Sequence, residues 1–411
     1  MVETNFKHTE IGLIPHDWEV ATLGELVNVH DGTHQTPHYV NVGVNFYSVE
    51  NITNNEFSKT KFISEEEHAL LTRKFKIERG DVLMTRIGSI GVCKYIDWDV
   101  RASFYVSLAL LKNKDKDRLY MPFLAFASTT KEFKDSVSQN SLQFAIPLKI
   151  NLGKISDITF PLPPTLAEQE RIAGALSSID TLIGALNEQI EKKRHIKQGT
   201  MQQLLTGKKR LAGFTGEWKE VRLGDVAKLK SGYAFKSTTY SNIGTFKIIT
   251  IANVQNGVLD MSDYNKIAEI PSNIQEHQIL KEGDILVSMT GNVGRVCRVD
   301  CENCLLNQRV GVFALKNTID AEYLYVILNS LEFEKEMIGK GHGAAQPNIG
   351  SSDVESYCFV VPPTIAEQSA IAAVLSGMDT EIAALEQKRD KYIAIKSGMM
   401  QDLLTGKIRL V

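Results

Sequence analysis

The sequence lacks a hydrophobic run long enough to cross a bilayer, and its first ten residues are polar, unlike a secretory signal. Five cysteines among 411 residues are too few, and odd in number, for a disulfide framework. These absences favour a reducing compartment, and we expect a cytoplasmic protein. The hydrophobic content of 43% is that of a globular chain with room for two or three domains.

An excess of positive charge is also missing. Residues 1–162 carry 18 basic and 20 acidic side chains, and residues 212–361 carry 14 and 18. Neither segment has the composition of a strongly basic nucleic-acid binder. If the chain binds DNA, local loops make the contacts or a partner supplies much of the affinity for phosphate.

Several catalytic signatures are missing as well. The sequence has no Asn/Asp-Pro-Pro-Tyr/Phe loop to hold a flipped adenine, and no Gly-x-x-x-x-Gly-Lys-Ser/Thr loop to bind a nucleotide phosphate. It has no Gly-x-Gly-x-x-Gly turn after a strand, and its carboxylates form no spacing typical of a nuclease. We therefore expect a chain that does not itself perform a reaction.

What the sequence does contain is a duplication. The tract from Pro163 to Leu211 matches the tract from Pro362 to Leu410 without a gap, with 28 identities over 49 positions. The segments before these tracts repeat more weakly: each opens on Trp-x-x-x-x-Leu-Gly-Glu/Asp, at Trp18 and at Trp218. The chain therefore uses one construction twice, and its function is best read as a pair.

Each matching tract is expected to be a helix of about 40 residues, or roughly 60 Å if straight. Thr165 with Glu168 forms a capping box at its start, repeated by Thr364 with Glu367. Glycines stand where the helices should end, at positions 207 and 406. A heptad seam runs along the first helix, made of Ile172, Leu176, Ile179, Ile183, Leu186 and Ile190.

This order predicts two similar mixed α/β domains, 1–160 and 208–360, each followed by a long helix, 161–207 and 361–411. The second helix buries a matching seam along its full length only by running back along the first. We therefore predict an antiparallel coiled coil with approximate two-fold symmetry. The alternative is that the seams pair with another copy of the chain.

Together these features resemble the specificity (S) subunit of type I restriction-modification enzymes, over essentially the whole chain. The marks are the doubled Pro-Pro-Thr-x-Ala-Glu-Gln, the two Leu-Leu-Thr-Gly-Lys endings and the Trp openings. The stretches 31–37 and 231–235 also look like those that follow such openings in the family.

The resemblance implies two target-recognition domains, each reading half of a split site in double-stranded DNA. It implies a type I modification methyltransferase subunit as partner, usually in two copies, and possibly restriction subunits. S-adenosylmethionine, and ATP with Mg²⁺ for restriction, would be cofactors of those partners, with no cofactor in this chain.

Base recognition in the major groove favours Arg, Lys, Asn, Gln, Ser or Thr on protruding loops. We take as candidates the polar loops after residues 32 and 232, the glycine turns near residues 88 and 291, and two glutamines before the last strands. An ordinary solvated loop or hairpin is the alternative for each. In the first domain the candidates are Thr33, His34, Gln35, Thr36, Arg86, Ser89 and Gln143. In the second domain they are Tyr233, Lys236, Ser237, Asn292, Arg295 and Gln346.

The resemblance makes the outward surfaces of the long helices docking sites for modification subunits. Four residues near the helix starts are the predicted interface: Glu168, Gln169, Glu367 and Gln368. Helix capping explains the two glutamates equally well.

Two rival functions remain open. Cys297, Cys301 and Cys304 form a C-x₃-C-x₂-C pattern, by which radical S-adenosylmethionine enzymes bind an iron–sulfur cluster; a structural zinc is a lesser possibility. The corresponding stretch of the first domain has only Cys93, so plain thiols without a metal are favoured. The second rival is an adaptor whose coiled coil joins two protein-binding domains with no role in DNA binding.

Overall fold

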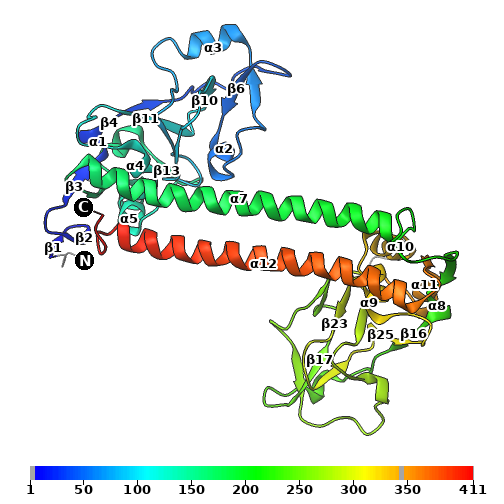
Figure 1. Cartoon of the computed structure of the whole chain (residues 1–411). Helices are drawn as coiled ribbons and strands as arrows, with labels where there is room; N and C mark the ends of the chain where they lie inside the picture. The colour runs from blue at the N-terminus through cyan, green and yellow to red at the C-terminus, as the bar shows by residue number, and fades with distance from the viewer. Residues whose placement is uncertain (1–4, 342–346, 411) are drawn as a thin grey trace. The chain divides into compact units, whose positions relative to one another are not determined.

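The computed structural model describes residues 5–341 and 347–410, and it separates into two compact units (Figure 1). Unit 1 comprises Met1–Asn187 with Gln387–Val411, and unit 2 comprises Glu188–Glu386. Two long helices, α7 (Leu166–Leu204) and α12 (Ile365–Leu403), each contribute a segment to both units. Within the described ranges, no helix is both long enough and apolar enough to cross a membrane.

Unit 1 is built on two four-stranded sheets. The first is antiparallel, in the order β4 (Val27–Asp31), β11 (Leu108–Asn113), β8 (Val82–Thr85) and β9 (Cys93–Tyr95). The second pairs β10 (Ala102–Phe104) with β6 (Val44–Tyr47) in parallel, and continues antiparallel through β7 (Lys61–Ile63) to β5 (Tyr39–Val40). The short helices are α1 (Leu23–Leu26), α2 (Val49–Thr53), α3 (Glu65–Leu71), α4 (Met121–Ala127), α5 (Lys131–Gln139) and α6 (Leu152–Ile155). Two hairpins complete the unit: β1 (Phe6–Thr9) with β2 (Gly12–Pro15), and β12 (Ser141–Leu142) with β13 (Lys149–Ile150).

The first sheet of unit 1 lies between two hydrophobic cores. In β8, Val82 and Met84 belong to the core that includes α4 and α5, while Leu83 belongs to the core shared with the second sheet. Successive side chains of a strand point to opposite faces, so a strand covered on both faces needs a continuous apolar run. This is why β8 has no polar face.

Unit 2 repeats the first sheet and three strands of the second, but it adds the fourth strand of the second sheet at the opposite edge. Its antiparallel sheet runs β16 (Ala227–Ser231), β25 (Val310–Leu315), β22 (Ile285–Ser288), β23 (Val296–Arg298). Its second sheet runs β20 (Asn265–Ile267), β17 (Phe246–Ile249), β24 (Cys304–Leu306), β21 (Ile279–Leu280), with β17 and β24 parallel. The remaining elements are the hairpin β18 (Val254–Gln255) with β19 (Val258–Leu259), α8 (Leu223–Val226), α9 (Ala321–Leu328), α10 (Leu331–Lys340), α11 (Ser351–Glu355), and the 3₁₀ turns η1 (Ser237–Thr239) and η2 (Glu276–Gln278). The predicted mixed α/β construction, present twice, is confirmed.

A pair of antiparallel strands brings the beginning and the end of each α/β segment together. In unit 1, β3 (Glu19–Thr22) pairs with β14 (Thr159–Leu162). In unit 2, β15 (Lys219–Arg222) pairs with β26 (Cys358–Val361). The last strand of each pair leads through a Pro-Pro step into a long helix.

In unit 1, the start of α7 and the end of α12 lie side by side and run in opposite directions (Figure 1). Ile172 and Leu176 of α7 share a core with Leu403 at the end of α12. Further along α7, Asp180 Oδ1 lies 2.6 Å from Lys396 Nζ. Lys396 comes before Leu403 in α12, so a later residue of α7 contacts an earlier residue of α12. The order of these contacts shows antiparallel packing.

Unit 2 has the reciprocal arrangement. Leu375 near the start of α12 shares a core with Leu204 at the end of α7. Along the pair, Lys197 Nζ lies 2.5 Å from Asp379, and Lys193 Nζ lies 2.5 Å from Glu381. The predicted antiparallel pairing is therefore confirmed inside each unit, with both helices supplied by one chain rather than by another copy.

The helix ends also follow the prediction. Gly207 and Gly406 both have φ of +69°, the left-handed conformation that closes a helix and that glycine adopts without strain. A Cβ added to Gly406 would lie 2.3 Å from Pro15 Cγ, so close packing as well as conformation requires glycine there. Gly199 and Gly398 lie within uninterrupted helix.

Candidate nucleic-acid interface

Three loops of unit 1 meet at the edge where the candidate recognition residues lie. They are the loop after β4, the turn after β10 and the glycine turn after β8. Thr33 N donates a hydrogen bond to Phe104 O (3.1 Å), and Val106 N donates one to Thr33 O (2.9 Å). Arg86 N donates to Ser107 O (2.9 Å). Because these bonds join backbone to backbone, they give the loops a fixed frame, which we call the recognition frame.

Arg86 does not project from this frame as a free cation. Its side chain is 11% exposed, and its Nη1 lies 2.5 Å from Asp31 Oδ1. The other carboxylate oxygen of Asp31 lies 2.7 Å from Nε2 of His34, whose side chain is 71% exposed. Arg86 therefore anchors Asp31, which in turn orients His34, and of these three side chains His34 is the exposed one.

The remaining candidates of unit 1 are at the surface. Gln35 and Thr36 are exposed in the loop after β4, and Ser89 is exposed in the glycine turn. The carbonyl of Ser89 accepts a hydrogen bond from the buried Thr85 hydroxyl, which fixes the turn beneath it. Gln143 is exposed too, although its amide donates to Ser138 O at 2.5 Å. These positions suit hydrogen bonds to base edges or phosphates.

Unit 2 has the same recognition frame at the corresponding edge. Tyr233 N donates to Leu306 O (2.8 Å), and Gln308 N donates to Tyr233 O (2.9 Å). Met289 N donates to Arg309 O (3.0 Å). These three bonds correspond one by one to those of unit 1. Met289 therefore takes the place that an arginine has in unit 1.

The loop after β16 combines an anchored aromatic residue with exposed polar ones. The Tyr233 hydroxyl donates to Asn273 Oδ1 (2.9 Å), and its ring packs edge-on against Phe235 at 4.9 Å between centroids. Lys236 and Ser237 are exposed at the start of η1. Tyr233, Phe235 and Lys236 line a cavity of about 600 Å³. An exposed ammonium at such a place suits a phosphate.

The glycine turn of unit 2 presents one of its two candidates. Asn292 is exposed, and its carbonyl accepts from the Ser288 hydroxyl. Arg295 is half-buried and donates through Nη1 to the Gln255 side chain. Arg295 therefore holds the β18–β19 hairpin. Gln346 lies outside the described residues.

Sequence reasoning missed two residues of this frame. Gln308 and Arg309 are exposed in the turn between β24 and β25, directly beside the loop that carries Tyr233. The available signal was the polar run from Asn307 to Arg309 between two buried apolar strands. An exposed arginine beside the recognition frame is suited to bidentate contact with guanine or phosphate.

The four residues predicted as a subunit interface lie inside the chain. They are Glu168 (1% exposed), Gln169 (0%), Glu367 (0%) and Gln368 (2%). Glu168 accepts two hydrogen bonds from Arg409, at 2.5 and 2.8 Å, and Glu367 accepts two from Arg210, both at 2.7 Å. The expectation that these side chains face outward from the helices is therefore wrong, because an arginine from the segment after the other long helix covers each glutamate and the α/β segment covers each glutamine.

The two glutamines of this set satisfy buried backbone groups. Gln169 Oε1 accepts from Tyr120 N (2.9 Å), and its amide donates to Arg118 O (2.8 Å). Gln368 Oε1 accepts from Asp320 N (2.8 Å). Each glutamine thus connects a long helix to the α/β segment of its own unit.

The capping-box prediction is half correct. Glu168 N donates to the Thr165 hydroxyl at 3.3 Å, and the same distance recurs at the start of α12. The carboxylates do not return to the backbone of the capping threonines, because the arginines hold them.

Arg409 also donates to both oxygens of Asp17, at 2.7 and 2.8 Å. These bonds raise the pKa of Arg409 and lower that of Asp17.

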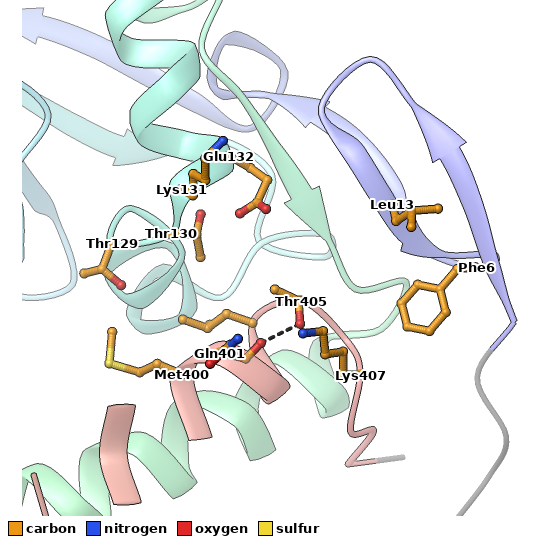
Figure 2. Close-up of a pocket in the computed structure, with 11 residues that line it drawn as sticks. Phe6, Leu13, Thr129, Thr130, Lys131, Glu132, Met400, Gln401, Thr405 and Lys407 are labelled. Carbon is orange, nitrogen blue, oxygen red and sulfur yellow. Dashed lines mark hydrogen bonds between the residues drawn. The ribbon is translucent and has the colours of Figure 1, made fainter. Parts of the chain in front are cut away.

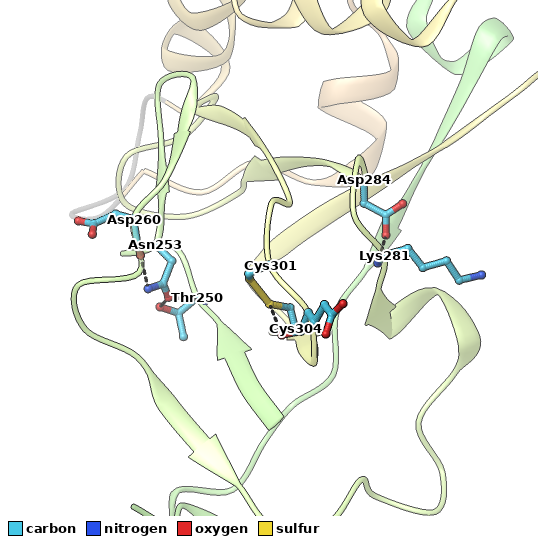
Figure 3. Close-up of a disulfide and its surroundings, with 8 residues drawn as sticks. Thr250, Asn253, Asp260, Lys281, Asp284, Cys301 and Cys304 are labelled. Carbon is cyan, nitrogen blue, oxygen red and sulfur yellow. Dashed lines mark hydrogen bonds between the residues drawn. A yellow bond between two sulfur atoms is a disulfide. The ribbon is translucent and has the colours of Figure 1, made fainter. Parts of the chain in front are cut away.

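The three cysteines behind the metal hypothesis are not arranged as three ligands. Cys301 and Cys304 form a disulfide across the turn before β24 (Figure 3). Cys297 is buried in the core of unit 2, and burial raises the pKa of its thiol to about 12. A metal binds the thiolate, which this environment disfavours. The expectation of plain thiols is wrong for Cys301 and Cys304, since the turn between them brings the two sulfurs into bonding range.

Comparison with known proteins gives one answer for most of the chain. A family model described as the type I restriction modification DNA specificity domain matches residues 15–193 and again residues 215–394. The putative type I restriction enzyme MjaX specificity subunit of Methanocaldococcus jannaschii is 28% identical over 438 residues, covering 99% of this chain and 97% of that protein. The MjaVIII specificity subunit of the same organism is 28% identical over 429 residues with the same coverage. The crystal structure of the type I S subunit from M. genitalium has a similar fold, with 16% identity and a TM-score of 0.62 over 94% of this chain and 96% of that one.

Proposed function

Because the chain belongs to the type I restriction modification DNA specificity family, we propose that its two recognition frames read the two halves of one bipartite DNA site. The chain is the specificity subunit, and it is not the catalytic one. In this proposal residues 1–160 and 208–360 are the recognition domains, and the segments 161–207 and 361–411 are the helices that carry them. S-adenosylmethionine then belongs to a modification subunit, and ATP with Mg²⁺ to restriction subunits. The cytoplasm, where the cell's DNA is accessible, is the place of action.

The observation that carries the proposal is the repetition of the recognition frame. Each unit joins the same three loops by the same three backbone hydrogen bonds, yet the side chains on the two frames differ. His34 and Ser89 are exposed in unit 1, whereas Lys236 and Arg309 are exposed in unit 2. Two domains that recognise different base sequences would need the same backbone arrangement with different side chains, since the side chains determine which bases are bound.

The modification subunits are proposed to dock beside the long helices, once in each unit. In unit 1, a groove of about 580 Å³ lies between the β1–β2 hairpin, the corner before α5 and the last turns of α12 (Figure 2). Leu13 (57% exposed) and Met400 contribute apolar surface to it. Exposed apolar residues that line a groove mark a place for a protein partner.

Unit 2 has a groove at the matching position. It measures about 330 Å³ and lies between the last turns of α7 and the corner before α10. Met201, which aligns with Met400 in the duplicated tract, lines it together with Leu331 (49% exposed). Two grooves of related composition support two copies of one partner.

The function is tested by sequencing methylated bases in cells with and without this chain. We expect one bipartite methylated-adenine motif to disappear when the chain is deleted and to return when it is restored. Exchanging residues 1–160 for those of a relative should then change one half of the motif and leave the other half intact. A motif that persists in the deletion strain, or two halves that change together, would contradict the proposal.

The two-copy proposal is tested with Leu13→Glu and Leu331→Glu. Each places a charge on an exposed wall of one groove, so the fold should tolerate it. The mass of the complex, measured by light scattering, should fall by one modification subunit for each single variant and by two for the double variant. Val42→Glu, at an 88% exposed position of unit 1 outside the groove, is the control and should leave the mass unchanged. Unchanged masses for all variants would place the docking surface elsewhere.

A further inference from the structure

The hairpin of β12 and β13 presents apolar side chains to solvent at its tip. Phe144 is 99% exposed and Ile146 is 100% exposed. Leu142 and Leu148, at the ends of this turn, are 41% and 36% exposed. Scattered apolar side chains are normal on a surface, but a cluster at full exposure on a projecting turn marks a contact with another molecule.

The tip is held in place by the recognition frame of unit 1. Gly88 N donates to Leu148 O at 2.7 Å, and Ile150 N donates to Arg86 O at 2.9 Å. Ile87 forms a β-bridge with Lys149. The hairpin is therefore bonded directly to the glycine turn that carries Ser89, which places the tip next to the recognition frame.

The charges around the tip favour a polyanion. Residues 136–156, which include the hairpin, contain Lys149 and Lys154 and no acidic residue. Residues 82–96, which include the glycine turn, contain Arg86 and Lys94 and again no acidic residue. Arg86 is paired with Asp31 at 2.5 Å and Lys154 with Asp157 at 2.7 Å, so the positive charge offered to a ligand is that of Lys94 and Lys149. Asp81, Asp97, Asp135 and Asp157 bound these two segments, so the lack of acids is confined to the turn and the hairpin themselves. Segments without negative charge on both sides of an apolar tip can approach the phosphates on either side of a base step.

We propose that Phe144 and Ile146 form a wedge that inserts into the base stack of the half-site read by unit 1. Proteins that kink or open a duplex insert Phe, Leu, Ile, Met or Pro between base steps, and an aromatic ring replaces part of the lost stacking. Gln143 and Lys149 flank the wedge and can hold the bases or phosphates beside the opened step. This inference rests on the proposed function and deepens it. The chain would recognise how easily the DNA is deformed at one base step, in addition to the edges of the bases.

The test uses the complex of this chain with its modification subunit and a duplex carrying the motif found by methylation sequencing. 2-Aminopurine is placed at successive positions of the half-site that changes when residues 1–160 are exchanged. We expect a rise in fluorescence at one step on binding, since unstacking removes quenching. Phe144→Ala with Ile146→Ala should abolish this rise and weaken binding about tenfold or more.

A matched control is available in the same unit. Val42 is 88% exposed in the loop between β5 and β6, outside the recognition frame, and Val42→Ala should change neither fluorescence nor affinity. Because both wedge side chains are exposed, their removal should leave the melting temperature unchanged. Phe144→Trp gives a second readout: its emission should be quenched by duplexes with the motif and much less by duplexes without it.

The outcomes separate this inference from the proposed function. If the wild-type complex binds the motif, no 2-aminopurine position responds and the double variant binds equally well, the wedge is wrong while the function stands. If the double variant loses its modification subunit during purification, the tip is a protein interface and the wedge is also wrong. If the wild-type complex binds no bipartite motif, the proposed function fails and the wedge fails with it.

Discussion

Replacing Arg409 by alanine should strongly destabilise unit 1, because this residue pairs with the buried Glu168. Glu168 is 1% exposed, and the Arg409 side chain is 9% exposed. Removing one partner of such a pair leaves the other charge buried and uncompensated, which costs about 3–5 kcal/mol. The lost contact with Asp17, whose side chain is 53% exposed, adds less than about 1 kcal/mol.

The expected total for Arg409→Ala is therefore about 3–5 kcal/mol in the free energy of unfolding of unit 1. For a unit of this size, each kcal/mol lowers the melting temperature by about 2–4 °C. Calorimetry of the full chain should show one transition moving down by roughly 6–20 °C. A second transition, from unit 2, should stay in place if the units unfold separately.

The cause is tested with Glu168→Gln in the Arg409→Ala background. An amide carries no charge to leave uncompensated, so the double variant should recover a large part of the loss, with a coupling energy of at least about 1 kcal/mol. Arg210→Ala in unit 2 is a matched comparison. Its side chain is 27% exposed, and Trp218 Nε1 also donates to Glu367 at 3.3 Å, so its effect should be smaller. A loss below about 1 kcal/mol for Arg409→Ala, or no recovery with the amide, would refute the reasoning.

Three further results are expected. Bonding to Arg409 lowers the pKa of Asp17 below its unfolded value of 3.8, so its stabilisation is full above that value and disappears as pH falls through the lower folded pKa. Melting curves should show Asp17→Asn less stable than wild type at pH 6–8 and equal to it in strong acid; a constant difference would contradict this. Gly406→Ala should destabilise by more than about 1 kcal/mol in urea titration, because the site combines positive φ with the Pro15 ring, whose Cγ would lie 2.3 Å from the added Cβ. Gly207→Ala should cost less, since its added Cβ would meet a side chain at 3.3 Å, and equal costs would be unexpected. Thiol titration of the unfolded chain should count three free thiols before reduction and five after; five at the outset would show that the disulfide is absent.

The scaffold could be predicted from the sequence because its signals are local and repeated. The 3–4 spacing from Ile172 to Ile190 requires only that neighbouring helix turns share a face. The glycines that end the helices are read from position alone, since few other residues adopt positive φ there. Duplication adds the decisive constraint, because a pattern that occurs twice in the same order is not accidental.

The partners of the charged residues could not be predicted, because no local pattern contains them. Glu168 and Arg409 are 241 positions apart, and the same capping motif explains the glutamate without any arginine. The recurrence of arginine at 210 and 409 was visible, but its partner appears only after the chain folds back. Arg86 was likewise read as an exposed contact because its pairing with Asp31 crosses 55 positions. Ion pairs between residues far apart in the sequence thus determine which of the predicted site residues are exposed.

The pairing of β3 with β14, and of β15 with β26, has a genetic consequence. Each α/β segment starts and finishes at adjacent strands, so a substitute of different length or composition can be accommodated if its two ends form the same short ladder. The tracts beyond those ladders share 28 identities over 49 positions, so each segment leads into a similar helix. Under the proposed function, exchanging one such segment would change one half-site, and it would also exchange the groove wall at the corner before α5 or α10.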